Sequence, residues 1–177
     1  MKTTQHSWLY FLPIIALTLL LVTRWQTSQS QSIALSSDET LPNINLPALF
    51  HPANRFTTQM LRGKVTLLNI WASWCSNCQS EHATLMTIKN SVPIYGIIFK
   101  DNAEDAKAWL RSTGNPYTAI GADPDGALAM TLGIEGIPQT FVIDKHGIIR
   151  YDFKGALNMH SWKNTLQPLV EQLNNES

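Results

Sequence analysis

Apolar and polar positions form blocks along the chain after residue 40, and these blocks have the lengths of strands and helices. Two continuous apolar runs, Val65–Trp71 and Pro93–Phe99, predict strands that are buried on both faces of a sheet. A helix is expected after each run. The first is predicted over Ser76–Asn90, and the second begins at Asp101 or Asn102, both candidate N-caps, and ends near residue 114.

The second half of the chain predicts a hairpin and a final helix. The segments Pro138–Asp144 and Gly147–Phe153 read as two antiparallel strands joined by a tight turn. A short helix is expected before them, over Ala127–Leu132, and a last helix over Ser161–Leu173. No internal repeat is visible. This order predicts an α/β fold with a central sheet covered by helices on both faces.

The amino-terminal residues have a different pattern. Trp8–Val22 is an uncharged apolar run, and Thr23, Arg24 and Trp25 follow it as an amphipathic flank. No A-x-A-like cleavage site follows, so an uncleaved membrane anchor over residues 1–26 is expected, with a cleaved signal peptide and a buried core helix as alternatives. Residues 27–40 then predict a flexible linker, and residues 41–177 the folded domain.

Composition narrows the function classes. The 177 residues suit one domain with a tail, and 44% hydrophobic with 15% charged residues is typical of a globular chain. The formal net charge is zero and no block of Lys or Arg occurs, which argues against nucleic-acid binding.

The chain has only two cysteines, and both lie in the stretch WASWCSNC. Cys75 and Cys78, three positions apart across a predicted helix start, lie on one side of the first turn and can form a disulfide, with Cys75 at the exposed end. The helix N-terminus stabilises a thiolate, which lowers the pKa of Cys75 and makes it the nucleophile, while Cys78 resolves the mixed disulfide. The alternatives are two inert core cysteines, or a metal half-site completed by His82, which is more simply a surface or packing histidine.

WASWCSNC, followed some sixty residues later by GIEGIPQTFVID, resembles a thioredoxin-fold oxidoreductase. Together with FKDNAEDAKAWLRSTGNPY, these motifs resemble the membrane-anchored thiol:disulfide interchange proteins of cytochrome c maturation, the DsbE/CcmG type, over about Leu41–Leu169. The resemblance implies a thioredoxin-like fold, no metal, and no cofactor beyond the redox-active Cys75–Cys78 disulfide.

The resemblance also suggests roles for single residues. Pro138 is expected to follow a cis peptide bond opposite the dithiol, so that the Ile137 backbone can pair with an extended substrate; the alternative is a trans proline starting an edge strand. Glu81 is expected near the dithiol as a proton acceptor for Cys78, or else as a first-turn residue that serves the helix dipole. From the residues themselves, Trp74 is expected on the docking surface, Trp71 in the core, and Gly114–Tyr117 in a turn without chemistry.

Two positions depart from the family pattern. Ser76 stands where a proline commonly follows the first cysteine, and it would bring an extra N–H group and a hydroxyl near the Cys75 sulfur. Gln139 stands where a carboxylate commonly follows the cis-proline, which puts an acidic docking groove in doubt.

The resemblance implies the function of an exported reductant that is anchored in the inner membrane, with its catalytic domain in the periplasm. Its expected partners are apocytochrome c, or a thiol protein that handles it, and a membrane thiol donor of electrons. The alternatives are a general exported thiol reductase or oxidant with another client, and a metallochaperone that uses Cys75, Cys78 and His82.

Overall fold

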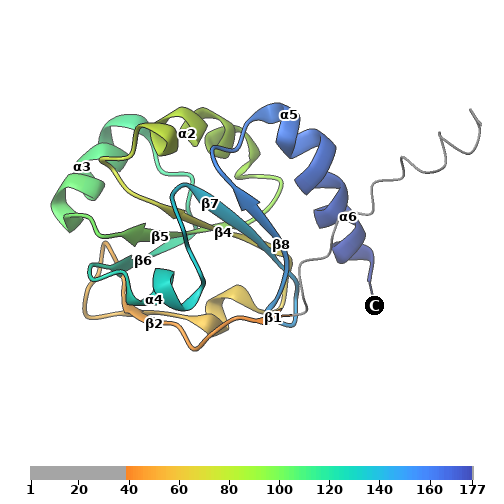
Figure 1. Ribbon diagram of the computed structural model, residues 1–177, viewed down its shortest axis with the longest axis horizontal. Coiled ribbons are helices and arrows are strands. Elements are labelled where there is room, and N and C mark those ends of the chain that lie inside the picture. The colour runs from red at the N-terminus through yellow and green to blue at the C-terminus, as the bar shows by residue number, and fades with distance from the viewer. Residues whose placement is uncertain (1–38, 177) are drawn as a thin grey trace, which may run out of the picture. The chain divides into compact units, whose positions relative to one another are not determined.

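The computed structural model describes residues 39–176, which form a central mixed sheet with helices packed against it (Figure 1). Within this part of the chain the central sheet has six strands. They are β1 (Glu39–Thr40), β4 (Thr66–Trp71), β5 (Ile94–Phe99), β6 (Ala119–Asp123), β7 (Gln139–Ile143) and β8 (Ile148–Lys154). Their spatial order is β1-β8-β7-β4-β5-β6. Strands β4, β5 and β6 run parallel, and the other neighbouring pairs are antiparallel.

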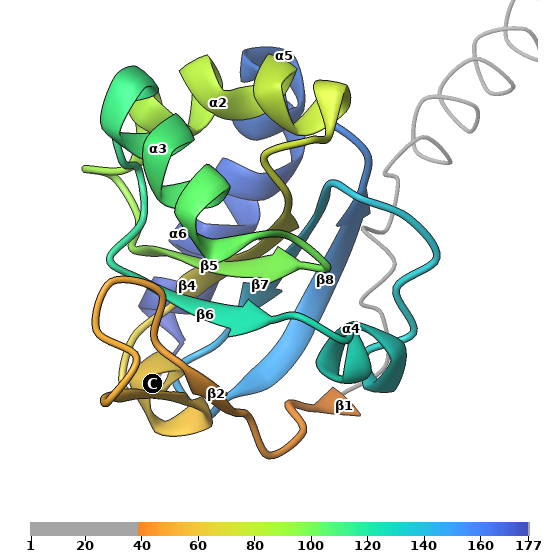
Figure 2. The ribbon, with the colours of Figure 1, turned by 90° about the vertical axis from the view of Figure 1, so that its left-hand side faces the viewer.

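Helices cover both faces of this sheet. They are α2 (Ser76–Ile88), α3 (Ala103–Thr113), α4 (Ala127–Thr131), α5 (Met159–Ser161) and α6 (Gln167–Asn175), and a π-helical turn over Trp162–Leu166 joins the last two. A small antiparallel sheet of β2 (Asn45–Pro47) and β3 (Arg55–Thr57) leads into a short 3-10 helix over Thr58–Leu61. Helices α2, α3, α5 and α6 lie over one face, whereas α4 and the β2-β3 segment lie over the other (Figures 1 and 2).

The sheet separates two hydrophobic cores because side chains alternate between its faces along each strand. Leu67 and Trp71 of β4 pack with buried residues of α2, α3 and α6, while Leu68 and Ile70 pack with the β2-β3 segment and α4. All six residues of β4 are buried, as expected for a strand that is covered on both faces. Asn69 is buried with them and lies on the same face as Leu67 and Trp71, where it needs hydrogen-bond partners.

The elements predicted from the apolar pattern are confirmed apart from their ends. The two apolar runs form β4 and β5, and the helices predicted after them are α2 and α3. The predicted hairpin is the β7-β8 pair, with an irregularity in register at Val142 and Ile143. The last helix begins earlier than expected, at Met159, and continues through the π-helical turn to Asn175.

Strand β6 was not predicted. Ala119–Asp123 contains one large apolar side chain, Ile120, so no apolar run marks the strand. Its position depends on close packing, because a Cβ atom added at Gly121 would lie 3.0 Å from the ring of Phe56. Pairing with β5 and the absence of a side chain at residue 121 therefore place this strand, and neither feature is visible as hydrophobicity.

The start of the domain also differs from expectation. Glu39 and Thr40, which the sequence assigned to the linker, form β1 and pair with Ile149 and Ile148 of β8. The predicted anchor over residues 1–26 and the linker up to residue 38 lie outside the described residues. From residue 39 to residue 176, no helix is long and apolar enough to cross a membrane.

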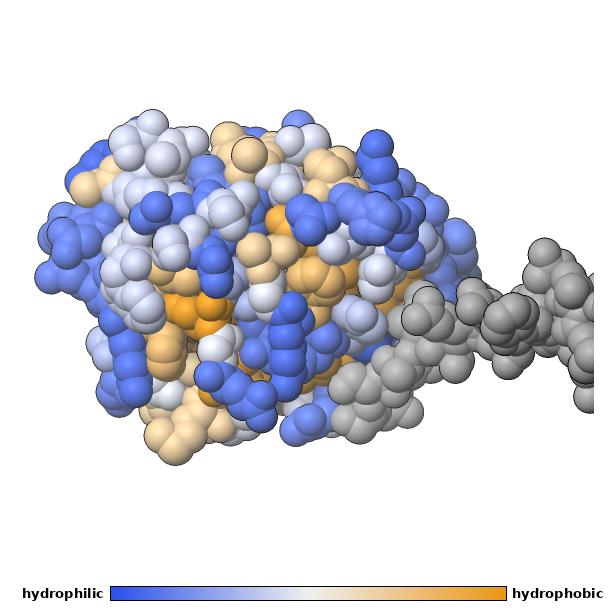
Figure 3. Space-filling view, turned by 45° about the horizontal axis from the view of Figure 1, so that its top comes forward, coloured by the Kyte–Doolittle hydropathy of each residue, from blue (hydrophilic) through white to orange (hydrophobic). Residues whose placement is uncertain are grey.

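The face of the domain that Figure 3 shows is mostly hydrophilic, with a few apolar areas. Within residues 39–176, the large apolar side chains that are exposed are Phe50, Met60, Trp74 and Met130. Trp74 is the one that is adjacent to a cysteine.

Candidate active site

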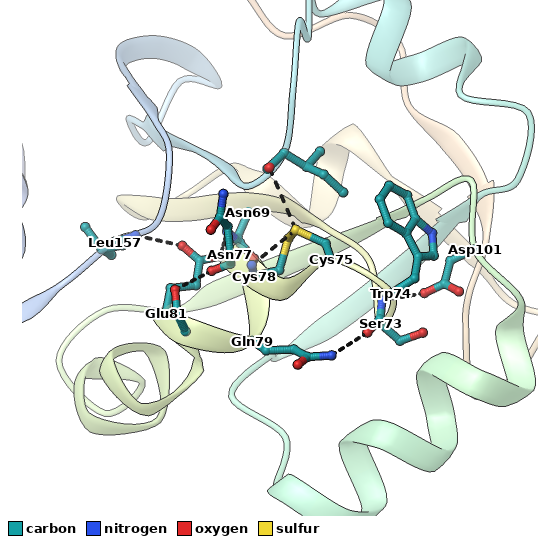
Figure 4. Close-up of a disulfide and its surroundings, with 12 residues drawn as sticks. Asn69, Ser73, Trp74, Cys75, Asn77, Cys78, Gln79, Glu81, Asp101 and Leu157 are labelled. Carbon is teal, nitrogen blue, oxygen red and sulfur yellow. Dashed lines mark hydrogen bonds between the residues drawn. A yellow bond between two sulfur atoms is a disulfide. The ribbon is translucent and has the colours of Figure 1, made fainter.

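The two cysteines form a disulfide at the start of α2 (Figure 4). Cys75 is the N-cap of the helix in an extended conformation, and its Sγ accepts a hydrogen bond from the Cys78 N–H group at 3.2 Å. The first N–H groups of a helix have no partner within it, so a sulfur at this position satisfies one of them. After reduction the same N–H group and the helix dipole would stabilise a thiolate on Cys75.

Cys75 is less exposed than the sequence predicted. Cys75 was expected at an exposed end, yet only 7% of it is exposed, against 3% of Cys78. The Cys75 Sγ lies 3.8 Å from the carbonyl oxygen of Ile137. Ile137 itself packs against the hydrophobic core that contains both cysteines. Ser76 is exposed, and within residues 39–176 the Cys78 N–H is the group that donates to this sulfur, so the expected contribution of Ser76 is not found.

The loop before Cys75 is fixed from two sides. Ser73 N–H donates to Asp101 Oδ2 at 2.6 Å, and the Ser73 carbonyl accepts from Gln79 Nε2 at 2.9 Å. The Trp74 indole N–H donates to the carbonyl of Lys100 at 3.0 Å, while 58% of Trp74 remains exposed, as expected for a docking surface. These contacts hold the loop in place beside the disulfide (Figure 4).

Of the two candidate N-caps of α3, Asp101 and Asn102, the structure uses Asn102. The N-cap of α3 is Asn102, whose Oδ1 accepts from the N–H groups of Glu104 at 2.8 Å and Asp105 at 3.3 Å. Asp101 is thus free to accept the Ser73 N–H. The preceding residue, Lys100, has a φ of 46°, a conformation that few non-glycine residues adopt, and this places its carbonyl under the Trp74 indole.

The peptide bond between Ile137 and Pro138 is cis, as expected. Pro138 is buried, and its carbonyl accepts from Gly155 N–H at 2.9 Å, which ties the start of β7 to the end of β8. Within the described residues the Ile137 N–H group has no hydrogen-bond partner. An unpaired N–H group next to the disulfide is what an extended peptide would need in order to pair with this edge.

Glu81 is buried one turn beyond Cys78, with 1% of its surface exposed. Its Oε1 accepts from Asn69 Nδ2 and its Oε2 from Leu157 N–H, both at 2.9 Å (Figure 4). Burial raises the pKa of Glu81 from 4.5 to about 7, and the two hydrogen bonds, which favour the ionised form, offset only part of this increase. A carboxyl group with this pKa can both accept and donate a proton near neutral pH.

Three polar residues that the sequence analysis did not single out complete this network. Tyr117 donates from its hydroxyl to Asn69 Oδ1 at 2.8 Å, and Asn69 Nδ2 also donates to Thr140 Oγ1 at 3.0 Å. Tyr117, which the sequence analysis placed in a turn without chemistry, thus lies in the hydrogen-bond network of Glu81. The detectable signal was Asn69, a single polar residue inside an apolar strand, since a buried amide requires partners.

Gln139 lies outside this network. Thr140 faces Asn69, so the alternation along β7 turns Gln139 to the opposite face, where it is buried and donates to Asp152 Oδ1 at 2.6 Å. The departure from the family pattern at this position therefore does not change the surroundings of Glu81.

His82 does not form a metal site with the cysteines. Its Nε2 lies 3.2 Å from the Thr113 carbonyl, and its ring packs edge-on against Trp109 with the centroids 4.5 Å apart. Among the described residues, no group of three or more His, Cys, Asp or Glu side chains could hold a metal ion. His82 is thus a packing histidine that connects α2 to α3.

Comparison with known proteins supports thiol-disulfide exchange at this site. The Redoxin family model matches residues 36–167. The thiol:disulfide interchange protein DsbE of Pseudomonas aeruginosa is 41% identical over 136 residues, which cover 76% of this chain and 76% of that protein.

Solved structures show the same fold. A secreted thiol-disulfide isomerase from Corynebacterium glutamicum superposes with a TM-score of 0.66 at 25% identity, covering 74% of this chain and 85% of that one. The thioredoxin domain of a thiol-disulfide oxidoreductase from Bacteroides vulgatus gives a TM-score of 0.63 at 23% identity, covering 77% and 99% of the two chains. The described domain therefore has a thioredoxin-like fold, with a central mixed sheet and flanking helices.

Proposed function

Because the chain belongs to the DsbE-type thiol:disulfide interchange proteins of the redoxin family, we propose that it is the dithiol reductant of a cytochrome c maturation system. The family and the Cys75–Cys78 disulfide make it a thiol-disulfide oxidoreductase. The observation that carries the proposal is the disulfide at a helix N-terminus, one turn from a buried carboxyl group and next to the unpaired N–H of Ile137.

The reaction begins with both cysteines reduced. The Cys75 thiolate attacks one sulfur of the client disulfide, a new S–S bond forms between Cys75 and the client, and the second client sulfur leaves as a thiolate. The Cys78 thiolate then attacks Cys75 Sγ and displaces the client's first sulfur. The client gains two electrons and becomes a dithiol, and Cys75–Cys78 becomes the disulfide seen here.

Glu81 is proposed to accept the proton that Cys78 must lose before this second attack. Cys78 and Glu81 are three residues apart on α2, which puts them on the same side of the helix. With a pKa of about 7, a large share of Glu81 is ionised at neutral pH and ready to take the proton. In the reverse direction, when a donor reduces the disulfide, the protonated Glu81 would return a proton to the departing Cys78 sulfur.

The client is proposed to dock as an extended segment along Ile137. Its backbone would pair with the free N–H group of Ile137, and its cysteine would face the Cys75 sulfur, which lies 3.8 Å from the Ile137 carbonyl. The exposed indole of Trp74 forms the adjoining apolar wall.

The client and the location follow from the resemblance and from the amino-terminal sequence. We propose that the client is apocytochrome c, or a thiol protein that handles it, and that reduction of the two haem-binding cysteines precedes haem attachment. The apolar run Trp8–Val22 supports an inner-membrane anchor with the domain in the periplasm. In that oxidising compartment the disulfide would need a membrane thiol donor to return it to the dithiol form.

The first test is the reduction potential of the full chain, equilibrated in graded thiol/disulfide buffers and followed by tryptophan fluorescence. A value well below about −180 mV is expected for a reductant, whereas a value near about −120 mV would make the protein an oxidant and remove the cytochrome c proposal. Cys75→Ser should abolish the reduction of a disulfide-bonded apocytochrome c peptide, and His82→Ala should leave it close to wild type. Loss of activity in His82→Ala, together with stoichiometric metal binding, would favour the metallochaperone instead.

A further inference from the structure

Asn69 is a fully buried amide whose hydrogen bonds connect four separate parts of the fold. Its Nδ2 donates to Glu81 of α2 and to Thr140 of β7, and its Oδ1 accepts from the hydroxyl of Tyr117, just before β6. Glu81 in turn accepts from the backbone of Leu157, between β8 and α5. Because the amide has one donating and one accepting side, its orientation decides which of the two faces Glu81.

The hydroxyl of Tyr117 decides this orientation. Within residues 39–176, Asn69 Oδ1 is the only hydrogen-bond partner of that hydroxyl, and Tyr117 is buried. If the amide turned over, the phenol proton would lose its acceptor at a buried side chain, which is unfavourable. The present orientation satisfies the hydroxyl and directs Nδ2 at the carboxyl group of Glu81.

The ring that carries this hydroxyl is itself held in place. Tyr117 stacks on Trp71, with the centroids 5.4 Å apart and the planes 13° from parallel. Gly96 leaves the space for this pair, since a Cβ atom there would lie 3.0 Å from both Trp71 Nε1 and Tyr117 Cδ1. The hydroxyl therefore has little freedom to follow the amide if the amide moves.

We propose that Tyr117 is a positioning residue of the dithiol reaction, whose hydroxyl holds the Asn69 amide so that it donates to Glu81 and keeps the carboxylate ready to take the Cys78 proton. This inference rests on the role proposed above for Glu81. It adds a residue whose hydroxyl bonds to Asn69 and to neither cysteine within residues 39–176, and which comes from a different part of the chain.

Burial has the largest effect on the ionisation of Glu81, and the hydrogen bonds from Leu157 N–H and from Asn69 act against it; the bond from Asn69 is the one that depends on Tyr117. The titratable groups that face it are Tyr117 and, on its own helix, Cys78, while β4, β7 and the segment before α5 contribute neutral groups. His82, the next residue, turns to α3 instead. Donation from Asn69 Nδ2 favours the ionised carboxylate, whereas a reversed amide would accept from the protonated carboxyl group and favour the neutral form.

The test compares Tyr117→Phe with Tyr95→Phe in the full, oxidised chain, in which the cysteines do not titrate. Tyr95 is a matched control, because it is a buried tyrosine of the same sheet whose hydroxyl makes no hydrogen bond within the described residues and whose ring packs in the opposite core. The side-chain carboxyl signal of Glu81, assigned with Glu81→Gln, is followed by carbon-13 NMR against pH. Tyr117→Phe should raise the titration midpoint by about one pH unit, and Tyr95→Phe should leave it in place.

An unchanged midpoint in Tyr117→Phe, or an equal increase in Tyr95→Phe, would overturn the inference. A second variant tests the route through the amide: in an Asn69→Leu background, Tyr117→Phe should add no further shift, and a further shift would contradict the proposal. The titration does not depend on any client. Absence of reductase activity in wild type, or full activity in Cys75→Ser, would therefore reject the proposed function and leave this titration interpretable. An unchanged titration midpoint in Tyr117→Phe would in turn leave the proposed function standing.

Discussion

Replacing Glu81 with glutamine should change how the stability of the oxidised protein depends on pH. Burial raises the pKa of Glu81 in the folded state to about 7, while in the unfolded chain the group titrates near its ordinary value of 4.5. Each pH unit between these values corresponds to about 1.4 kcal/mol, so ionisation of the buried group lowers the free energy of unfolding by about 3 kcal/mol.

The direction follows from proton counting. Between pH 4.5 and about pH 7 the folded state keeps the Glu81 proton and the unfolded state does not, so the free energy of unfolding falls as the pH rises. The contribution is complete below pH 4.5 and is lost as the pH passes through the folded-state pKa. His82 acts in the opposite sense, since burial lowers its pKa below 6.5 and the folded state loses stability when the pH falls. The difference between wild type and Glu81→Gln removes the contribution of His82.

The assay is urea unfolding of both oxidised proteins at a series of pH values from about 4 to about 9, with equal m-values as the check on two-state behaviour. Glutamine will have its own constant effect, because its amide group must face at least one of the two N–H donors that Glu81 accepts from. The prediction concerns the change with pH: relative to Glu81→Gln, wild type should lose about 3 kcal/mol between the acidic and the alkaline limit. A difference that stays constant across this range would show that Glu81 does not titrate with a raised pKa.

Two further substitutions test how the site is supported. Gly96→Ala adds a Cβ 3.0 Å from the stacked rings of Trp71 and Tyr117 and should lower the free energy of unfolding, measured in urea, by about 1–3 kcal/mol. Gly136→Ala is the control, because nothing lies within 4 Å of its added Cβ, and it should have a much smaller effect. Asp101→Ala removes the acceptor of the Ser73 N–H and should slow client reduction several-fold with little loss of stability. Asp105→Ala, an exposed change on α3, should leave the rate of client reduction unchanged. Equal rates in the two variants would contradict the idea that Asp101 fixes the loop before Cys75.

The sequence predicted those parts of the fold whose signal is local. The continuous apolar runs of β4 and β5, and the Gly-containing turn between β7 and β8, each carry their own signature, and each was found. Strand β6 has one large apolar residue, Ile120, and is placed by pairing with β5 and by the contact of Gly121 with Phe56. Such a strand is defined by neighbours that are distant in the chain, which a local pattern does not contain.

The residues of the site likewise fall into those that a local motif identifies and those that only the folded chain brings together. Cys75, Cys78 and Pro138 belong to motifs with characteristic spacing, so they could be named from the sequence, and their disulfide and cis bond are present. Tyr117 lies 48 residues from Asn69 in the chain, and their hydrogen bond exists only because β4, β5 and β6 lie side by side. The exposure of Cys75 was overestimated for the same reason, because Ile137, 62 residues away, lies over the sulfur.

The proton transfer proposed for Glu81 would account for a buried carboxyl group that the stability of the fold does not require. A neutral side chain of similar shape at residue 81 would not carry the penalty of about 3 kcal/mol that ionisation imposes above neutral pH. The fold nevertheless directs two N–H donors at this group and holds one of them in place through Tyr117, an arrangement that brings the pKa of Glu81 close to neutral instead of leaving the group permanently protonated. A group adjusted in this way serves a proton transfer in both directions, which is what alternate formation and reduction of the Cys75–Cys78 disulfide requires.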